Sequence, residues 1–275
     1  MATALRPLST GELLDRTFSL YRSHFVLFLG IFALPHLAVL AFQCVGFVFH
    51  SPTPQLANIL LTSLWSLVSG IFSIMVSAAS QAATVVAVSQ VHLDRPTSIT
   101  DSFSRVKDQI PGVVGLSLLI GLVVVLGCFL LIVPGVLLAI QWSLAVPIKV
   151  LENRGMTDAM QRSADLTKGS RGRIFVIWLL FIVLSIGVGF LLRWPVEMAA
   201  GVTSIFALQQ TAPGWQIALL VSAFIGQCLV GPLVTIAFSL VYYDQRVRKE
   251  AFDLQLMMTT LDAPVLQSAP VQAGA

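Results

Sequence analysis

The side chains with polar chemistry inside the apolar segments of this chain are few. His36 is the one titratable side chain near the middle of such a segment. It follows Pro35, which frees a backbone carbonyl one turn earlier, so we expect a packing histidine bonded to a backbone carbonyl. A second segment carries a polar stripe at every fourth position: Ser69, Ser73, Ser77 and Gln81. Small residues at this spacing let helices pack closely, and the alternative is a polar groove for a lipid headgroup or a partner helix.

Charged residues gather at the ends of the apolar segments. We predict that seven of them form an ion-pair network that joins the N-terminal helix, the loop before residue 174 and the C-terminal arm: Arg16, Arg22, Glu152, Arg162, Asp244, Arg246 and Glu250. The alternative is a set of independently solvated charges, each worth less than about 1 kcal/mol. Three amides, Gln43, Gln141 and Gln227, are candidates for a polar cluster between helices, although their spacing fixes no distance between them.

No pattern typical of an active site, a metal site or a cofactor site is present. The sequence has no Gly-x-Ser-x-Gly, no His-Glu-x-x-His and no Cys–His pairing. The basic segment 168–173 contains glycine but lacks the strand and the spacing of a P-loop. We therefore expect no catalytic residue, no metal and no cofactor. The basic residues form short clusters without aromatic interleaving, which argues against nucleic acid as a partner.

The composition requires that these side chains be positioned by membrane helices. The chain is 56% hydrophobic and 11% charged, and residues 23–93, 109–148, 174–192 and 198–243 contain no Lys, Arg, Asp or Glu. A membrane helix takes about 20 apolar residues, so these stretches accommodate several spans. This excludes a soluble single-domain enzyme and predicts an all-α, polytopic membrane helix bundle with about six transmembrane helices and short interfacial helices on the cytoplasmic side.

The predicted organisation is a single membrane domain over residues 1–262. An interfacial helix covers 9–22, and the spans cover about 25–49, 56–92, 112–133, 136–151, 174–192 and 214–242. A tight turn at Pro134-Gly135 joins the third and fourth spans, and a linker over 193–213 joins the fifth and sixth. A cytoplasmic arm follows at 243–262, and 263–275 forms a disordered tail. Whether the long second helix is continuous stays open.

Charge asymmetry predicts the orientation of the bundle. With six spans, every Lys and Arg except Arg193 falls on one side. By the positive-inside rule this side is cytoplasmic, so both termini face the cytoplasm of a bacterial cell with the protein in the inner membrane. The cytoplasmic rim would contact the lipid bilayer through anionic lipid headgroups.

A short pattern recurs before the first, third and fifth spans. It consists of a Ser or Gly, an acid three residues later and an Arg four residues after the acid: Ser9, Glu12, Arg16; Ser98, Asp101, Arg105; Gly155, Asp158, Arg162. The first two positions of the pattern are typical of a helix N-terminus, and the last two favour an (i, i+4) ion pair. The pattern is compatible with three units, each a surface helix plus a hairpin, and equally with coincidence.

The C-terminal arm has one apolar seam on a charged helix, formed by Val247, Ala251, Leu254, Met258 and Leu261. The spacing of the seam is that of an amphipathic helix. It would pack either on the inner face of the same chain or against a protein partner.

Three segments of the chain resemble one known family. Residues 11–22, 150–169 and 243–254 are similar to the membrane domain attached to some bacterial glycerophosphoryl diester phosphodiesterases, which also occurs alone. The last segment is the most specific, and it departs from the family pattern at Ala251, where Gly is usual. The resemblance implies an architecture and no activity, because the phosphodiesterase domain is a separate soluble barrel whose carboxylates and histidines this sequence lacks.

The sequence therefore favours a non-enzymatic integral membrane protein that acts as a scaffold or accessory subunit. The alternative is a small-molecule or lipid transporter, which the missing intramembrane charges and the lack of clear inverted repeats disfavour. A membrane-embedded hydrolase comes third. Scaffold and transporter differ in one observable feature, because a transporter should have a continuous polar cavity that reaches the middle of the bilayer.

Overall fold

A computed structural model describes residues 8–48, 56–93, 95–207 and 213–250 of the chain. Within these ranges the regular structure is entirely α-helical, as predicted. The helices are α1 Thr10–Ser23, α2 Phe25–Val48, α3 Leu56–His92, α4 Ile99–Val106, α5 Ile110–Leu130, α6 Ile132–Gln141, α7 Ala145–Glu152, α8 Met156–Thr167, α9 Arg171–Ala207 and α10 Pro213–Glu250.

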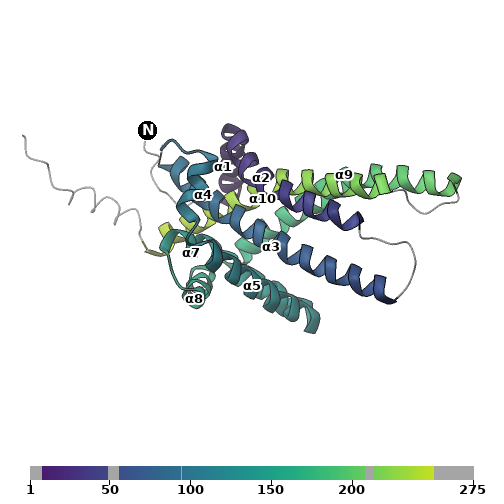
Figure 1. Ribbon diagram of the computed structural model, residues 1–275. Helices are drawn as coiled ribbons and strands as arrows, with labels where there is room; N and C mark the ends of the chain where they lie inside the picture. Colours follow the sequence, from purple (N-terminus) through teal and green to yellow (C-terminus); the bar gives the residue numbers. More distant parts are fainter. Residues whose placement is uncertain (1–7, 49–55, 94, 208–212, 251–275) are drawn as a thin grey trace, which may run out of the picture.

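Six segments are long and apolar enough to cross a membrane, which confirms the polytopic bundle. They are Phe25–Gly46, Leu56–His92, Ile110–Leu130, Ile132–Glu152, Arg171–Gly201 and Gly214–Glu250. The long helices extend from one end of the molecule, where α1, α4, α7 and α8 lie (Figure 1). Helix α10 is the central element, because it packs against α1, α2, α3, α7, α8 and α9.

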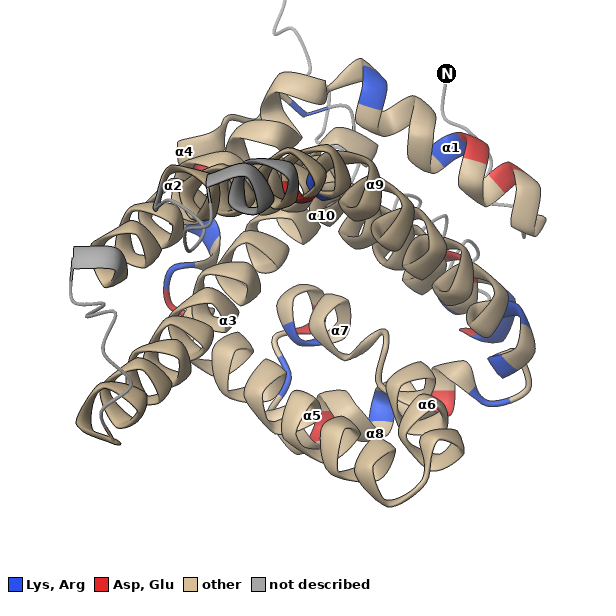
Figure 2. Cartoon of the chain, turned by 90° about the vertical axis from the view of Figure 1, so that its right-hand side faces the viewer, with Lys and Arg blue, Asp and Glu red and all other residues tan. Residues whose placement is uncertain are grey.

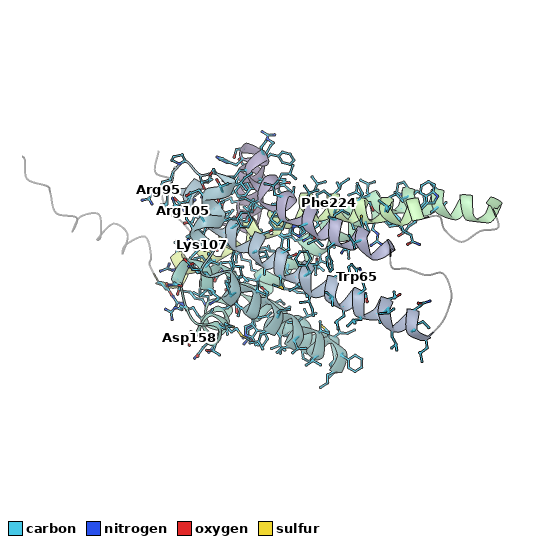
Figure 3. The ribbon with its side chains drawn as sticks, viewed as in Figure 1. Trp65, Arg95, Arg105, Lys107, Asp158 and Phe224 are labelled. Atoms are coloured by element: carbon cyan, nitrogen blue, oxygen red, sulfur yellow. The ribbon has the colours of Figure 1, made fainter. Side chains whose placement is uncertain are left out.

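Charged side chains concentrate where the short helices lie. Arg95, Arg105, Lys107 and Asp158 all lie at this end, whereas Trp65 and Phe224 lie farther along the bundle (Figure 3). Viewed along the bundle, the long helices carry few charged positions (Figure 2). We call the end formed by α1, α4, α8 and the last turns of α10 the charged end.

Helices begin at each of the three positions marked by the recurring pattern. Ser9 forms a full capping box with Glu12, and the Ser98 hydroxyl accepts from the backbone N–H of Asp101 at 3.2 Å. Gly155 precedes α8 without a side-chain cap. The predicted ion pair within the pattern is present between Asp101 and Arg105 at 2.9 Å. The threefold unit itself stays a prediction.

Helix α3 is continuous over 37 residues, about 55 Å at 1.5 Å per residue. Its second half is rich in small residues that are fully buried, among them Ala82, Ala83 and Ala87. These side chains allow α2, α5 and α10 to approach closely, and they place this half of α3 in the core. Its first half exposes large apolar side chains such as Leu60, Leu61 and Leu64, as a lipid-facing surface does.

The predicted turn at Pro134-Gly135 is wrong. The chain turns at Leu131, whose backbone is extended, and Pro134 lies in the first turn of α6. Proline is tolerated there because the first N–H groups of a helix have no intrahelical partner. Gly135 lies so close to the backbone of Cys128 that any side chain at position 135 would collide with that backbone. The glycine therefore allows α5 and α6 to pack closely.

The predicted linker over 193–213 is also wrong in its first part, because α9 continues to Ala207 with Pro195 inside it. Arg193 and Glu197 lie one turn apart in this extension, with 3.7 Å between Nε and Oε1. In an apolar environment an interrupted helix exposes backbone groups that water does not satisfy, so the helix continues through the proline.

The fourth span, by contrast, is divided into α6 and α7 by the residues Trp142–Leu144. The freed backbone groups are satisfied by α8. The Ser163 hydroxyl donates to the carbonyl of Gln141 at 2.8 Å and accepts from the N–H of Leu144 at 3.2 Å. One side chain thus stabilises both edges of the break.

Candidate functional site

Asp244 is the centre of the first charge cluster at the charged end. Its side chain is fully buried. One carboxylate oxygen accepts from the backbone N–H of Leu8 at 2.7 Å. The other accepts from Arg173 Nη1 at 2.5 Å and from Arg248 Nε at 2.9 Å. Both arginines also donate to the carbonyl of Leu8, at 2.8 and 2.5 Å. Asp244 therefore ties the segment before α1 to α9 and α10.

A second cluster surrounds Glu152 and Glu250. The hydroxyl of Tyr242, which is fully buried, donates to Glu152 at 3.0 Å and accepts from Arg246 Nη1 at 3.1 Å. Arg246 Nε donates to Glu250 at 3.1 Å, and Arg162 donates to the other oxygen of Glu250. Arg162 Nε also lies 3.6 Å from Glu152. This cluster joins the end of α7 to α8 and α10.

The structure thus brings together four of the seven charges predicted to form one network, namely Glu152, Arg162, Arg246 and Glu250. Asp244 belongs to the separate cluster. Arg16 Nη2 lies 3.4 Å from His92 Nδ1, and the His92 ring stacks on Tyr243.

Arg22, the remaining predicted member, is exposed in the last turn of α1.

Sequence reasoning missed four members of these clusters: Tyr242, Arg154, Arg173 and Arg248. Arg248 was detectable, because it lies four residues after Asp244 on the same helix. Arg154, whose Nε donates to Glu152 at 2.8 Å, is close in sequence to its partner. Arg173 and Tyr242 contact residues far away in the chain, so no local signal marks them.

A lysine completes the junction between α8 and α10. Lys249 Nζ donates to the backbone carbonyls of Asp165 and Lys168, at 2.7 and 2.5 Å. These carbonyls lie at the C-terminus of α8, where the helix dipole favours a cation. The carboxylates of Asp244, which is buried, and of Glu152 and Glu250, which are partly buried, are all engaged by cations of the same chain, so the chemistry of the charged end is that of a clamp between helices.

His36 is bonded within the bundle, as a packing histidine would be. Its Nδ1 lies 2.8 Å from the carbonyl oxygen of Phe32, and its Nε2 lies 3.2 Å from the hydroxyl of Ser77. Because a carbonyl only accepts, Nδ1 carries the hydrogen, and in the neutral ring Nε2 then accepts from Ser77. The carbonyl that accepts this hydrogen bond is that of Phe32. The carbonyl left free by Pro35 is that of Ile31, one residue earlier, so His36 does not bond the freed carbonyl itself.

The predicted polar stripe on α3 does not act as one unit. Ser69 is buried and donates to the Ser66 carbonyl at 3.1 Å. Ser73 and Ser77 line a cavity of about 280 Å³ beside His36, and Gln81 lines a larger one of about 370 Å³. The two cavities have Ala223 and Gln227 of α10 in common.

The larger cavity lies within the bundle between α2, α3, α7, α9 and α10, with Ser143 from the break before α7. Its polar lining consists of Gln81, Ser143, Ser185, Arg193, Gln227 and further hydroxyls on α10. Along α10 the lining extends from Ser222 to Phe238, about 24 Å of helix at 1.5 Å per residue. This stretch of α10 lies inside the candidate membrane span Gly214–Glu250.

No group of three His, Cys, Asp or Glu side chains that could hold a metal ion occurs within the described ranges. The C-terminal seam lies outside the described residues except for Val247, as does the tail at 263–275.

Comparison with known proteins gives one family. No curated protein and no solved structure shows a significant match. The model of the family described as the membrane domain of glycerophosphoryl diester phosphodiesterase matches residues 116–263, which is more than half of the chain. The match begins within α5 and includes the charged residues of both clusters and most of the cavity lining. The chain therefore belongs to the glycerophosphoryl diester phosphodiesterase membrane domain family.

Proposed function

We propose that this integral membrane protein is a transporter that moves a small polar or amphipathic molecule through the larger cavity. The observation that carries the proposal is the cavity wall on α10, whose polar residues Ser222, Gln227 and Thr235 extend over about 20 Å of the helix. A scaffold needs no such cavity, whereas a transporter needs polar groups at the depth where a polar solute would otherwise meet hydrocarbon.

The divided fourth span supports the same function. Transporters commonly bind substrate where a membrane helix is interrupted, because irregular backbone is tolerated where it lines a cavity. Here the break between α6 and α7 places Ser143 in the cavity lining, and Val146 and Pro147 of α7 lie beside it. The structure therefore combines an interrupted span with a polar cavity at the same place.

The scaffold hypothesis depends on the charged end and on the C-terminal arm. The carboxylates of the charged end are engaged by arginines within the chain. The cavity is therefore the better guide to function. We propose no enzymatic role, since the carboxylates of both charge clusters are held by arginines of the same chain.

We also propose that the charged end faces the cytoplasm, in the inner membrane of a bacterial cell. Reporter fusions after Arg95 and Arg154 should then show cytoplasmic fluorescence, and fusions after Pro54, Leu131 and Ala212 should show periplasmic phosphatase activity. The site after Leu131 tests the hairpin turn between α5 and α6. Phosphatase activity after Arg95 or Arg154 would contradict this orientation.

Transport predicts that one cavity position is reached by water from both sides of the membrane. We expect Gln227→Cys, in a chain whose three native cysteines are replaced by Ala, to react with a membrane-impermeant maleimide in right-side-out and in inverted vesicles. Ile225→Cys is the matched control, because Ile225 is exposed on the same helix but does not line either cavity described here. Labelling of Gln227→Cys from one side only would favour the scaffold.

A further inference from the structure

The hydroxyl groups that line the larger cavity all donate their hydrogens to backbone carbonyls of the protein. Ser143 donates to the carbonyl of Ile140 at 2.8 Å, and Ser185 donates to that of Phe181 at 2.6 Å. The two hydroxyls on α10 do the same within their own helix: Ser222 to Leu219 at 2.8 Å and Thr235 to Gly231 at 3.0 Å. Each hydroxyl keeps lone pairs, so the wall offers acceptors at four positions along its length.

Two amides offer both donors and acceptors. Gln81 and Gln227 line the cavity, and neither has a hydrogen-bond partner among the described residues. A polar group at membrane depth without a partner is costly, so these amides are best explained by a ligand or by water. A side chain added at Gly226 would lie 3.6 Å from Leu192, so the backbone next to Gln227 on α10 packs beside the part of α9 that carries Arg193.

Among the described residues that line this cavity, Arg193 is the only one with a charged side chain. The guanidinium has Glu197 beside it at 3.7 Å, and both side chains are about half exposed. Because no carboxylate lines the cavity, an ammonium ligand would have no compensating charge there. An anion, by contrast, would meet the Arg193 guanidinium and the Gln227 amide, which line the same cavity from neighbouring parts of α9 and α10.

We propose that the larger cavity binds a phosphate ester of a polyol, with the phosphate at Arg193 and Gln227 and the hydroxyl groups on the wall oxygens. The proposal rests on the proposed transport function and names its substrate class. A polyol supplies the donors that the four hydroxyl oxygens lack. Because these oxygens are spaced along the cavity, the hydroxyls of the ligand can exchange one acceptor for the next. The same chemistry belongs to a free polyol phosphate and to a lipid headgroup.

The test uses the full chain in phosphatidylcholine nanodiscs with two ligands. One arm measures binding of radiolabelled glycerol 3-phosphate, and the other counts phosphatidylglycerol molecules retained in native mass spectra. We expect saturable binding in one arm, which identifies the source. Arg193→Gln should weaken this binding about tenfold or more, and Arg193→Lys should retain part of it. Absence of binding in both arms would overturn the proposal.

Three further variants distinguish recognition of the negative charge of the ligand from recognition of its polyol hydroxyls. Arg105→Gln, at the charged end, should leave binding unchanged, and Glu197→Gln should leave it unchanged or tighten it. Ser185→Ala should weaken binding of the polyol phosphate about 2–10-fold, because it removes one acceptor, and should not weaken competition by inorganic phosphate. An equal effect on both ligands would show an anion site without polyol recognition, which contradicts the proposal.

The outcomes distinguish this proposal from the proposed function. Two-sided labelling of Gln227→Cys without binding of either ligand would leave a transporter with a different substrate. Binding that depends on Arg193 together with one-sided labelling would leave a polyol phosphate site in a protein that does not transport.

Discussion

Replacement of Asp244 by Ala should lower the free energy of unfolding by about 3–5 kcal/mol, the largest loss we expect from any single side chain at the charged end. The substitution leaves two guanidinium groups, those of Arg173 and Arg248, without their shared carboxylate. It also leaves the backbone N–H of Leu8 without its acceptor. Removal of one partner from a buried ion pair is more costly than the pair itself is stabilising, because the remaining charge, here chiefly that of the largely buried Arg173, stays desolvated.

The measurement is reversible unfolding of the purified protein in mixed micelles, followed by tryptophan fluorescence. Asp101→Ala is the matched control. Asp101 also pairs with an arginine, Arg105, at 2.9 Å, but both members of this pair are exposed enough for solvent to screen them. We expect a loss of less than about 1 kcal/mol for the control. Asp244→Asn should fall between the two, because the amide oxygen can still accept from Leu8. Equal losses in Asp244→Ala and Asp101→Ala would show that Asp244 is not a clamp.

The bundle was predictable from the sequence because membrane spans depend on local composition. Long uncharged stretches and the Ser9 and Ser98 caps act over a few residues, and the structure has helices where these signals occur. Prolines were less reliable guides. A turn was predicted at Pro134-Gly135 and a linker over 193–213, yet Pro134 and Pro195 both lie in helices, since the energetic cost of an interrupted helix is higher in lipid than in water.

The charge clusters were predictable only in part. The sequence places Glu152, Arg162 and Glu250 near the same membrane surface, and charges there find partners once the helices assemble. It does not fix the rotation of α9 and α10 about their axes. That rotation decides that Asp244 contacts Arg173 and that Tyr242 lies between Glu152 and Arg246.

The cavity was not predictable as a site. The stripe on α3 suggested one polar face, but Ser73 and Gln81 lie in different cavities because other helices cross α3 at different levels. Gln43 and Gln227 do line one cavity together, whereas Gln141 lies 3.4 Å from Arg171 at the charged end. Distances between helices are set by packing of small residues such as Gly226 and Gly231, and a single sequence does not encode them locally.

Gly189→Leu should block the larger cavity while it stabilises the helix. Gly189 lines the cavity, and a side chain added at this position meets nothing within 4 Å, so leucine enters the open space without a collision at its Cβ. Leucine replaces glycine inside α9, which favours the helix by about 0.5–1 kcal/mol. A ligand that must share the cavity with the new side chain loses about 1–3 kcal/mol, or about 5-fold to 150-fold in affinity.

The matched control is Gly187→Leu, two residues earlier on α9, where an added side chain also meets nothing within 4 Å but the position does not line the cavity. Both variants should unfold at the same or higher temperature than the parent chain, because both gain the same helix propensity. Only Gly189→Leu should suppress maleimide labelling of Gln227→Cys and binding of the polyol phosphate. Loss of labelling in both variants would show that the effect comes from the helix surface, and undiminished labelling in Gly189→Leu would show that the solute path does not pass between α9 and α10.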